Sequence, residues 1–565
     1  LFRLLKTICI NRWFFLFLYK SFIMKFTYSF FLLSTFFLII SCKTNSEEKE
    51  QEILWTAYDE TLELEMQQEH QNSRMQFELI QSKVLDKNEV YQPLNKEVSS
   101  FTNERYEALK PLILEQDIPT IQNHIKERSL TYEELTLFYL KRIYKFELDS
   151  TKTLNAIIAL NDEVLNEARA KDKDTTTNKH PIFGMPILLK DNINTKGMAT
   201  TAGAVALKDN YTTEDAKLVE NLKANGALIL GKLNLSEWAY YFCDGCPLGY
   251  SAIGGQTLNP YGRKAFETGG SSAGSGVATA ANYAVATVGS ETAGSIISPS
   301  SQNSVVGLKP TIGVISGDGI IPISHTLDTA GPMTKNVTDN AIVLDAMTSV
   351  NYKNILEENV SLTTKTFGVY KRLLNDSIYK STVKFLEDSG ATIVELDEPE
   401  LPLDGFLTLL NLEMKDDVPT YLSSYASKDV TVSSLEDVMA FNKKDSVLYM
   451  PYNQELFDGI IADSTSVEEF EAIKSTLLSN GNAFFQNDMK AHQLDAILSI
   501  NNYHSAYAAV GFHPCLAMPM GYKDTGEPIA LTFIGAPNTE RELLKMGLAF
   551  ETARPIRVLP ENYKD

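Results

Sequence analysis

The chain has 565 residues, of which 44% are apolar, and its formal net charge is −21. The apolar fraction suffices for a large folded core and excludes a disordered or collagen-like chain. The acidic balance repels phosphate backbones and argues against nucleic acid as a partner. The five cysteines are too few and too scattered to predict a disulfide framework.

The first 41 residues are typical of a signal or leader segment. They carry five basic and no acidic side chains, and residues 30–40 are nearly all apolar. An apolar core of this length is too short to span a bilayer, which takes about 20 residues, but it is typical of a secretory signal. Because the chain does not begin with Met, we expect the true start to be internal, near Met24.

The segment Ile39-Ile40-Ser41-Cys42 resembles a bacterial lipobox, in which the cysteine is acylated and becomes the first mature residue. We therefore expect lipidation at Cys42 and contact with a membrane only through this N-terminal lipid anchor. The expected location is the bacterial cell envelope, facing the periplasm or the surface. The alternative is an ordinary membrane anchor in which Cys42 is a simple thiol.

Residues 42–118 are polar and acidic, with a run rich in Glu and Gln between Glu47 and Gln71. This composition predicts an acidic, solvated tether followed by a helical extension. The alternative, a partner-binding coiled coil, lacks sustained heptads. From residue 119 to residue 562 the pattern changes to that of a folded domain.

Helices and strands alternate in this domain. Thr131 and Glu134 form a capping box ahead of apolar residues at helical spacing. Strands separated by helices predict an α/β fold, with a single large mixed, mostly parallel twisted sheet covered by helices on both faces. The predicted strands are 156–160, 186–189, 227–230, 367–370 and 391–394, and the predicted helices are 163–170, 216–224 and 377–386, with a helical, lid-like insertion at 401–485.

Residues 269–311 carry the chemistry. The stretch Gly269-Gly-Ser-Ser-Ala-Gly-Ser-Gly276 precedes a predicted helix of small residues over 277–288, and Gly289-Ser-Glu-Thr-Ala-Gly-Ser295 follows that helix. Glycines let a chain turn sharply and aim its amides at one point. Two serine-bearing glycine turns that flank one helix therefore indicate a nucleophile site.

Two other interpretations of this segment are weaker. A phosphate cradle would need Gly-Lys-Ser/Thr to close the loop, and this stretch has none. The stretch Gly270-Ser-Ser-Ala-Gly274 matches the nucleophile elbow of an α/β-hydrolase with Ser272 as nucleophile, but a polar loop precedes it where a buried strand is required. The base would then be His325, His504 or His513, none of which has a telling sequence context.

The segment resembles the Gly/Ser signature of the amidase signature family, which works with two serines and a lysine. Ser295 follows Ser271 by 24 positions, the spacing seen in that family, and Leu189-Lys190-Asp191-Asn192 resembles the family's lysine motif. The resemblance covers residues 120–560 and is closest to bacterial peptide amidases. Further matching stretches are 154–161, 233–239, 254–260, 307–311 and 323–333.

The resemblance implies a serine hydrolase that cleaves a C-terminal peptide amide, or another small primary amide, to carboxylate and ammonia. Ser295 would attack the carbonyl and be acylated, Ser271, which follows a cis peptide bond, would relay the proton, and Lys190 would accept it. Lys190 can accept a proton only if burial keeps it neutral. A lysine that is solvated or paired with Asp191 is the alternative. No metal or organic cofactor is implied.

Three neighbouring amides are expected to form the oxyanion hole, those of Thr292, Ala293 and Gly294. Ser272 is expected to hydrogen-bond to Lys190 from the second layer of the site. Small departures from the family pattern occur at Ala273 and Ala293. At position 297, glutamine-dependent amidotransferases carry arginine and this chain has isoleucine, which weakens a tRNA-amidotransferase interpretation.

Two questions stay open in the sequence. Cys243 and Cys246 lie in a loop expected near the mouth of the pocket, where a disulfide and two free thiols are equally compatible with the spacing. Two other functions also remain, a surface binding lipoprotein that kept the fold without turnover and a serine esterase or histidine-based hydrolase. For the amidase, the expected partner is a small-molecule or short peptide amide substrate.

Overall fold

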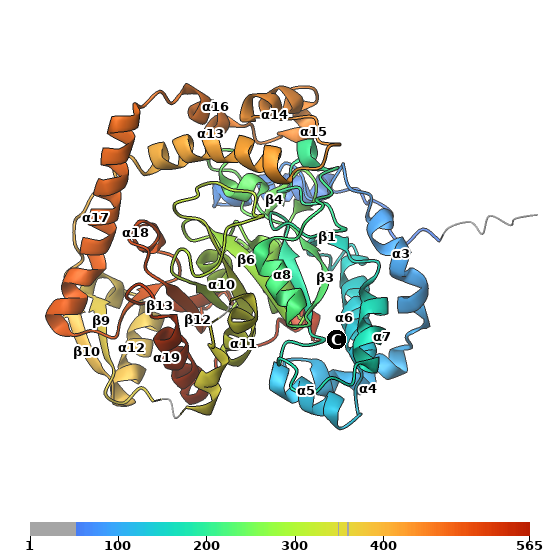
Figure 1. The fold of residues 1–565 in the computed structure, drawn as a ribbon, viewed down its shortest axis with the longest axis horizontal. Coiled ribbons are helices and arrows are strands. Elements are labelled where there is room, and N and C mark those ends of the chain that lie inside the picture. The colour runs from blue at the N-terminus through green and yellow to red at the C-terminus, as the bar shows by residue number, and fades with distance from the viewer. Residues whose placement is uncertain (1–51, 349, 359–360, 565) are drawn as a thin grey trace, which may run out of the picture. The chain divides into compact units, whose positions relative to one another are not determined.

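The computed structural model describes residues 52–348, 350–358 and 361–564, and residues 54–565 form one compact unit (Figure 1). Residues 1–41 and Cys42, to which the leader and lipidation predictions refer, lie outside the described residues. Across the described part of the chain, every helix is too short or too polar to cross a membrane.

An 11-stranded sheet forms the centre of the unit, and helices cover both of its faces. A separate hairpin joins β4 (Tyr250–Ser251) to β5 (Gly255–Gln256). In spatial order the large sheet consists of β1 (Ile157–Leu160), β3 (Leu228–Leu233), β2 (Pro186–Lys190), β6 (Ala286–Glu291), β8 (Thr329–Thr334), β7 (Val306–Lys309), β12 (Cys515–Tyr522), β13 (Pro528–Ile534), β11 (Ala496–Ile500), β9 (Thr366–Tyr370) and β10 (Thr392–Leu396).

The sheet is mixed, as predicted, but it is not mostly parallel. Its two parallel groups are β3–β2–β6 and β11–β9–β10, and they lie toward opposite edges of the sheet. The strands between them, together with β1, pair antiparallel. The prediction rested on strands separated by helices, and it did not include β6, β7, β8, β11, β12 and β13, which supply every antiparallel pair except β1–β3.

The helices follow from capping residues and amphipathic spacing. The predicted capping box is confirmed, because Thr131 Oγ1 accepts the Glu134 amide and the Glu134 carboxylate accepts the Thr131 amide. Together with short 3-10 turns, the helices are α2 (Thr61–Gln68), α3 (Lys87–Ser100), α4 (Asn103–Ile113), α5 (Ile118–Lys126), α6 (Tyr132–Glu147), α7 (Val164–Lys173), α8 (Lys217–Ala224), α9 (Ala273–Ala280), α10 (Ile297–Gln302), α11 (Val337–Met347), α12 (Ser377–Asp388), α13 (Phe406–Tyr425), α14 (Leu435–Asn442), α15 (Ser446–Tyr449), α16 (Glu455–Ala462), α17 (Val467–His492), α18 (Ser505–Val510) and α19 (Glu540–Ala553).

The predicted small-residue helix over 277–288 is wrong at its C-terminal half. Helix α9 ends at Ala280, and strand β6 begins at Ala286. Asn282 adopts a left-handed backbone conformation with φ 57°, and the Tyr283 amide donates to the Ala278 carbonyl. This arrangement ends a helix, because a residue in that conformation cannot continue the right-handed path.

Residues 54–118 fold onto the rest of the unit, so the prediction of a solvated tether is wrong for this stretch. Helices α2 to α4 form there and bury apolar side chains, among them Tyr91, Leu94 and Leu109. These side chains belong to the same hydrophobic core as the strands of the sheet. Of the acidic residues in the described part of the Glu- and Gln-rich run, Glu63 and Glu65 lie on helix α2, whereas Glu60 precedes it and is buried.

The insertion at 401–485 is helical, as predicted. Helices α13 to α17 occupy it, and α13 to α16 lie together at one end of the unit (Figure 1). A second hydrophobic cluster joins these helices to segments near Trp238, Cys243 and Ile323. The insertion therefore packs over the loops that follow the strands β3 and β7.

Candidate active site

Lys190 is the last residue of strand β2, and its side chain is completely buried. Its Nζ lies 2.8 Å from Ser271 Oγ, 2.9 Å from Ser290 Oγ and 3.1 Å from the Ser290 carbonyl oxygen. Burial lowers the pKa of Lys190 to about 7, although the carboxylates of Asp328 and Glu291 oppose this shift. A substantial fraction of the amine is therefore neutral near pH 7.

The alternative in which Asp191 pairs with Lys190 is wrong. The Asp191 carboxylate instead lies 3.1 Å from Lys232 Nζ, on strand β3. Successive side chains of a strand point to opposite faces of the sheet, so Lys190 and Asp191 diverge at the end of β2. Asp191 is thus paired with Lys232, and Lys190 forms its side-chain hydrogen bonds with Ser271 and Ser290.

Ser271 follows Gly270 through a cis peptide bond, as the resemblance implies. The next residue, Ser272, does not take the predicted role. Its Oγ donates to the Ser290 carbonyl at 2.9 Å and accepts the Ser290 amide at 3.2 Å, and it makes no hydrogen bond to Lys190. Ser290, whose Oγ also accepts from the Asn192 side chain at 3.0 Å, occupies the position expected for Ser272.

Ser295 lies in the turn between β6 and α10, on the wall of a pocket. The carboxylate of Glu291 fixes this turn. It accepts hydrogen bonds from the amides of Gly294 (2.7 Å), Ile296 (2.6 Å) and Ile297 (3.0 Å). The prediction of Gly294 as an oxyanion donor is therefore wrong in this conformation. Among the described residues, the amides of Thr292 and Ala293 have no protein acceptor.

Thr292 is fixed by a second acid, which is half-buried. Its Oγ1 donates to Asp328 Oδ1 at 2.5 Å, and Asp328 Oδ2 accepts the amides of Ile323 and Ser324 at 2.8 and 3.0 Å. Burial raises the pKa of Asp328 to about 6. This acid ties the turn that carries Ser295 to the loop that precedes strand β8.

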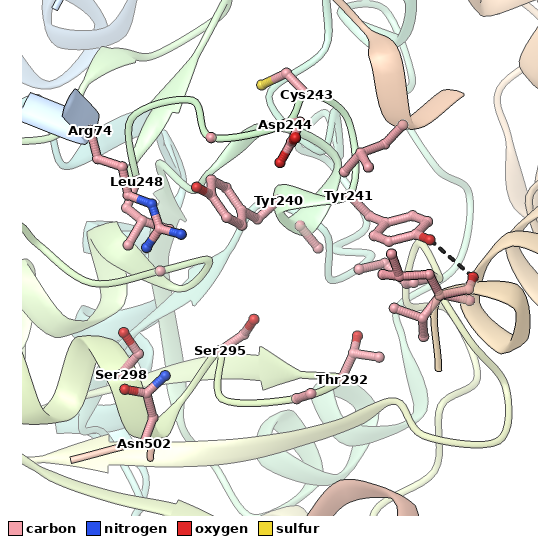
Figure 2. A pocket seen from close by; sticks show the side chains of 18 of the residues that line it. Arg74, Tyr240, Tyr241, Cys243, Asp244, Leu248, Thr292, Ser295, Ser298 and Asn502 are labelled. Atoms are coloured by element: carbon pink, nitrogen blue, oxygen red, sulfur yellow. Dashed lines mark hydrogen bonds between the residues drawn. The ribbon is translucent and has the colours of Figure 1, made fainter. Parts of the chain in front are cut away.

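The pocket above Ser295 has a volume of about 460 Å³, which is within the usual range for small-molecule sites. Figure 2 shows Ser295 between two differing sides of the pocket. Arg74, Leu248, Ser298 and Asn502 lie on one side. On the other, Tyr241 donates to the Leu407 carbonyl at 3.2 Å. Apolar side chains of Ile323, Phe406, Leu407, Leu410 and Leu456 also line the pocket.

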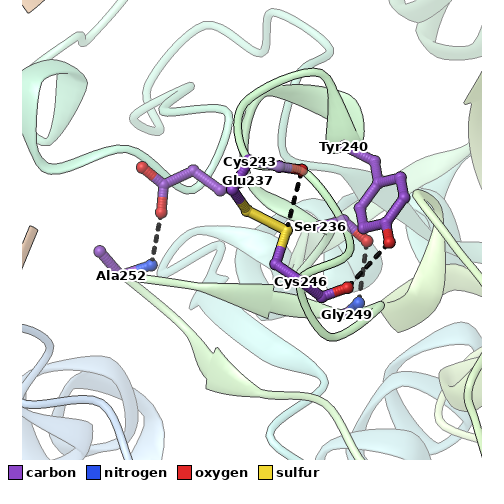
Figure 3. Close-up of a disulfide and its surroundings, with 7 residues drawn as sticks. All are labelled: Ser236, Glu237, Tyr240, Cys243, Cys246, Gly249 and Ala252. Atoms are coloured by element: carbon purple, nitrogen blue, oxygen red, sulfur yellow. Dashed lines mark hydrogen bonds between the residues drawn. A yellow bond between two sulfur atoms is a disulfide. The ribbon is translucent and has the colours of Figure 1, made fainter. Parts of the chain in front are cut away.

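Cys243 and Cys246 form a disulfide beside the pocket, which settles the question that the sequence left open (Figure 3). Cys243 lines the pocket, and the Tyr240 hydroxyl donates to the Cys246 carbonyl at 2.8 Å. Ser236, at the start of this loop, accepts the Gly249 amide through its Oγ, and its own amide donates to the Ser271 carbonyl. The disulfide loop is thus connected to both the pocket wall and Ser271.

The three histidines considered as bases lie away from the serines. His325 is exposed and contacts Asp417, His504 bonds to Ser499, and His513 bonds to the Gly535 carbonyl. Within the described residues, none forms a hydrogen bond with Ser271, Ser272 or Ser295. The geometry therefore does not support a histidine-based hydrolase.

Among the described residues, one group of side chains could hold a metal ion, namely His325, Glu413 and Asp417. Their ligand atoms are already engaged, because Asp417 contacts His325 and Glu413 accepts from the side chains of Ser324 and Thr326. These contacts account for the cluster as an anchor between the 323–327 loop and helix α13. None of the three residues lines the pocket.

Sequence reasoning missed the roles of Ser290, Glu291 and Asp328. Ser290 and Glu291 lie within the glycine-rich stretch that was singled out, but their roles depend on the pairing of β6 with β2, where Leu189 faces Val288. Asp328 lies 36 positions beyond its partner Thr292. Spacing along the chain gives no signal for a contact of this kind.

Comparisons with known proteins identify the family of this chain. The Amidase family profile matches residues 134–499. A probable amidase of Arabidopsis thaliana is 34% identical over 80% of this chain and 92% of the relative. The crystal structure of an amidase family protein from Bacillus anthracis superposes with a TM-score of 0.81 at 34% identity, covering 85% of this chain and 99% of that protein.

The native peptide amidase of Stenotrophomonas maltophilia has a TM-score of 0.74 and 34% identity, covering 80% of this chain and 99% of that protein. The family match spans more than half of the chain, and the relatives match over nearly their full length. The fold, the buried lysine–serine contact and these relatives together show that the chain belongs to the amidase signature family and is an enzyme that hydrolyses amides.

Proposed function

We propose that this amidase works through an acyl-enzyme formed on Ser295, with Ser271 as proton relay and Lys190 as base. The observation that carries the proposal is the contact of a completely buried lysine amine with Ser271 Oγ, at 2.8 Å, beneath the pocket that Ser295 lines. Serine is a weak nucleophile near neutral pH and needs a base. A lysine whose pKa is lowered to about 7 can act as that base.

The proposed proton route combines the contact between Lys190 and Ser271 with the position of Ser295 on the pocket wall. As Ser295 Oγ bonds to the amide carbon, its proton passes to Ser271 Oγ, while the proton of Ser271 passes to Lys190 Nζ. When the tetrahedral intermediate collapses, the C–N bond breaks and the leaving nitrogen takes a proton back along the same route. Water then attacks the ester by the same proton transfers, which releases the carboxylate and restores Ser295.

In the present conformation no hydrogen bond joins Ser271 Oγ to Ser295 Oγ among the described residues. Contacts of this type are often longer in free enzymes and tighten when substrate binds. The amides of Thr292 and Ala293 are the oxyanion donors that we propose, since neither amide has an acceptor among the described residues. Thr292 is held in place through its bond to Asp328, which would preorganise the hole.

We propose C-terminal peptide amides and other small primary amides as substrates, which yield carboxylate and ammonia. The pocket volume of about 460 Å³ suits a short peptide or a small molecule. Similarity to the Stenotrophomonas peptide amidase supports the same substrate class. No cofactor has a part in the proposed reaction.

The test is release of ammonia from amidated dipeptides by the wild type, Ser295→Ala, Lys190→Ala and a control variant, Ser275→Ala. Ser275 is also a buried serine, on helix α9, and its Oγ donates to the Val288 carbonyl at 3.2 Å. We expect loss of turnover in the first two variants and retention in the control. Labelling of Ser295 by a fluorophosphonate, read by peptide mass, identifies the nucleophile. Full activity in Lys190→Ala would refute the proposed base.

We also propose that the enzyme is anchored to the bacterial cell envelope through acylated Cys42. The support is the lipobox-like stretch after an apolar core in the sequence. The test is metabolic labelling with a radioactive fatty acid in a bacterial host. The wild type is expected to incorporate label and to fractionate with membranes, and Cys42→Ala is expected to do neither.

A further inference from the structure

Arg74 brings a positive charge to the pocket from outside the region that matches the family profile. It belongs to a short 3-10 turn, Ser73–Met75, whereas the profile match begins at residue 134. Figure 2 shows its side chain directed into the pocket beside Tyr240 and Leu248, on the same side of the pocket as Ser298 and Asn502. The N-terminal extension is therefore part of the pocket wall and not only of the core.

The segment that carries Arg74 is firmly held. Met75 and Phe77, on either side of Gln76, are buried in the main hydrophobic core. The amide of Glu78 donates to the Tyr452 hydroxyl at 2.7 Å. The Gln67 side chain donates to the Lys264 carbonyl at 3.1 Å. Because these contacts fix the backbone on both sides, Arg74 is presented to the pocket from a defined position.

The guanidinium group itself has no carboxylate partner. Its central carbon lies 5.9 Å from the centre of the Tyr240 ring, and no ion pair or side-chain hydrogen bond of Arg74 occurs among the described residues. An arginine supported on an aromatic ring keeps its planar donors free for a bidentate acceptor. A carboxylate is the partner that this geometry fits best.

Arg74 is also the sole cation among the described residues that line the pocket, where the other charged side chains are Asp244 and Glu267. Without Arg74, the charged groups of the wall would all be acidic, in a protein with net charge −21. An anionic substrate would then be repelled from the pocket. With Arg74 present, one side of the pocket attracts an anion while the side near Tyr241 and Leu407 accepts an apolar group.

We propose that Arg74 is a specificity-determining residue that binds a carboxylate in the acyl part of the substrate, on the side of the pocket opposite its apolar side. The substrate class is then an amide that bears an acidic group and an apolar group, such as an amidated peptide with an acidic residue. This inference rests on the proposed function and names the substrates of the same site.

The test compares kcat/KM for three substrates that differ at one residue, N-acetyl-Glu-Leu-amide, N-acetyl-Gln-Leu-amide and N-acetyl-Lys-Leu-amide. The wild type is expected to prefer Glu over Gln, and high salt is expected to reduce this preference. Arg74→Gln should lower kcat/KM for the Glu substrate at least about tenfold, chiefly through KM, and for the Gln substrate less than about threefold. The same variant should raise kcat/KM for the Lys substrate, because Asp244 and Glu267 then remain as the charged residues of the pocket wall. Arg74→Lys should retain part of the preference.

The matched control is Arg105→Gln, which removes an exposed cation of the same extension that pairs with Glu134 outside the pocket. The control should leave the Glu/Gln ratio unchanged. Equal losses on all three substrates in Arg74→Gln would indicate a structural role and overturn the inference, as would an unchanged ratio. If the wild type hydrolyses the Gln substrate but shows no preference for Glu over Gln, the inference about Arg74 is wrong and the proposed function still stands. Absence of hydrolysis of every amide refutes the proposed function as well.

Discussion

The carboxylate of Glu291 accepts the amide hydrogen of Gly294 at 2.7 Å, one residue before Ser295. The same carboxylate accepts the amides of Ile296 and Ile297. A single buried acid therefore fixes the backbone on both sides of the proposed nucleophile. It also removes the Gly294 amide from the set of groups that could stabilise an oxyanion.

We predict that Glu291→Gln lowers kcat by about 10- to 100-fold, because small displacements of a nucleophile carry losses of this order. An amide side chain keeps one acceptor oxygen and places donors against backbone N–H groups. KM should change little, since Glu291 does not line the pocket. The measurements are steady-state kinetics and the thermal midpoint.

Glu540→Gln is the matched control for this prediction. Glu540 is also buried, and its carboxylate accepts a backbone amide, that of Thr311, at 2.7 Å, away from the pocket. It should lose stability without a specific loss of kcat. If both variants lose kcat equally once they are folded, the positioning role of Glu291 is wrong.

The pKa of Lys190, lowered to about 7, predicts the pH profile. Only the neutral amine can accept the proton, so kcat/KM should rise with pH through a limb centred near pH 7. The profile of Ser275→Ala should show the same limb. A wild-type limb above pH 9 would contradict the lowered pKa, and residual activity of Lys190→Ala should lack the limb altogether.

The lowered pKa of Lys190 also predicts that the free energy of unfolding depends on pH. The pKa of Lys190 is lower in the folded chain than its ordinary value of 10.5, so between about pH 7 and 10.5 the unfolded chain binds more protons. Stability therefore rises with pH across this window, and the cost of the buried ammonium is fully present below pH 7. Relative to wild type, Lys190→Met should gain more in thermal midpoint at pH 6 than at pH 9.5. A difference that does not depend on pH would contradict the shift.

We predict that Ser290, and not Ser272, influences the pKa of Lys190. Ser290→Ala removes an acceptor 2.9 Å from Lys190 Nζ that favours the ammonium form. The activity limb should therefore shift to lower pH, with lower kcat because the amine is less well oriented. Ser272→Ala should leave the midpoint of the limb in place, since Ser272 makes no hydrogen bond to Lys190. A shift in Ser272→Ala alone would reverse the assignment.

Local patterns predicted the parts of the fold that local forces determine. The capping box at Thr131, the strand that ends at Lys190 and the helical insertion follow from periodicity and side-chain chemistry. The family resemblance also predicted that Lys190 and Ser271 belong to one site, because the two separated stretches that carry them resemble one family pattern. The contacts of Ser290, Glu291 and Asp328 could not be predicted in this way, since they depend on which strands pair and in which register.

The disulfide is predicted to shape the pocket more than to stabilise the fold. A bridge that closes so short a loop contributes about 2 kcal/mol on the chain-entropy estimate. Cys243 lines the pocket, and Tyr240 is tied to the Cys246 carbonyl. The double variant Cys243→Ser, Cys246→Ser should therefore raise KM for amidated dipeptides several-fold, with a smaller change in kcat. Reduction of the wild type should reproduce this effect, and the buried Cys515→Ser variant, with the disulfide intact, is the control.

The N-terminal extension is predicted to unfold together with the rest of the unit. Leu109, on helix α4, is fully buried in the main core, whereas Leu62, on α2, is 68% exposed. Leu109→Ala should lower the free energy of unfolding by about 2–5 kcal/mol, and Leu62→Ala should change it by less than about 0.5 kcal/mol. Urea unfolding, followed by tryptophan fluorescence and circular dichroism, should show one transition that shifts for both probes. A separate early transition in Leu109→Ala, with activity retained through it, would mean that the extension is an independent element, and Arg74 would then reach the pocket from a segment that can detach.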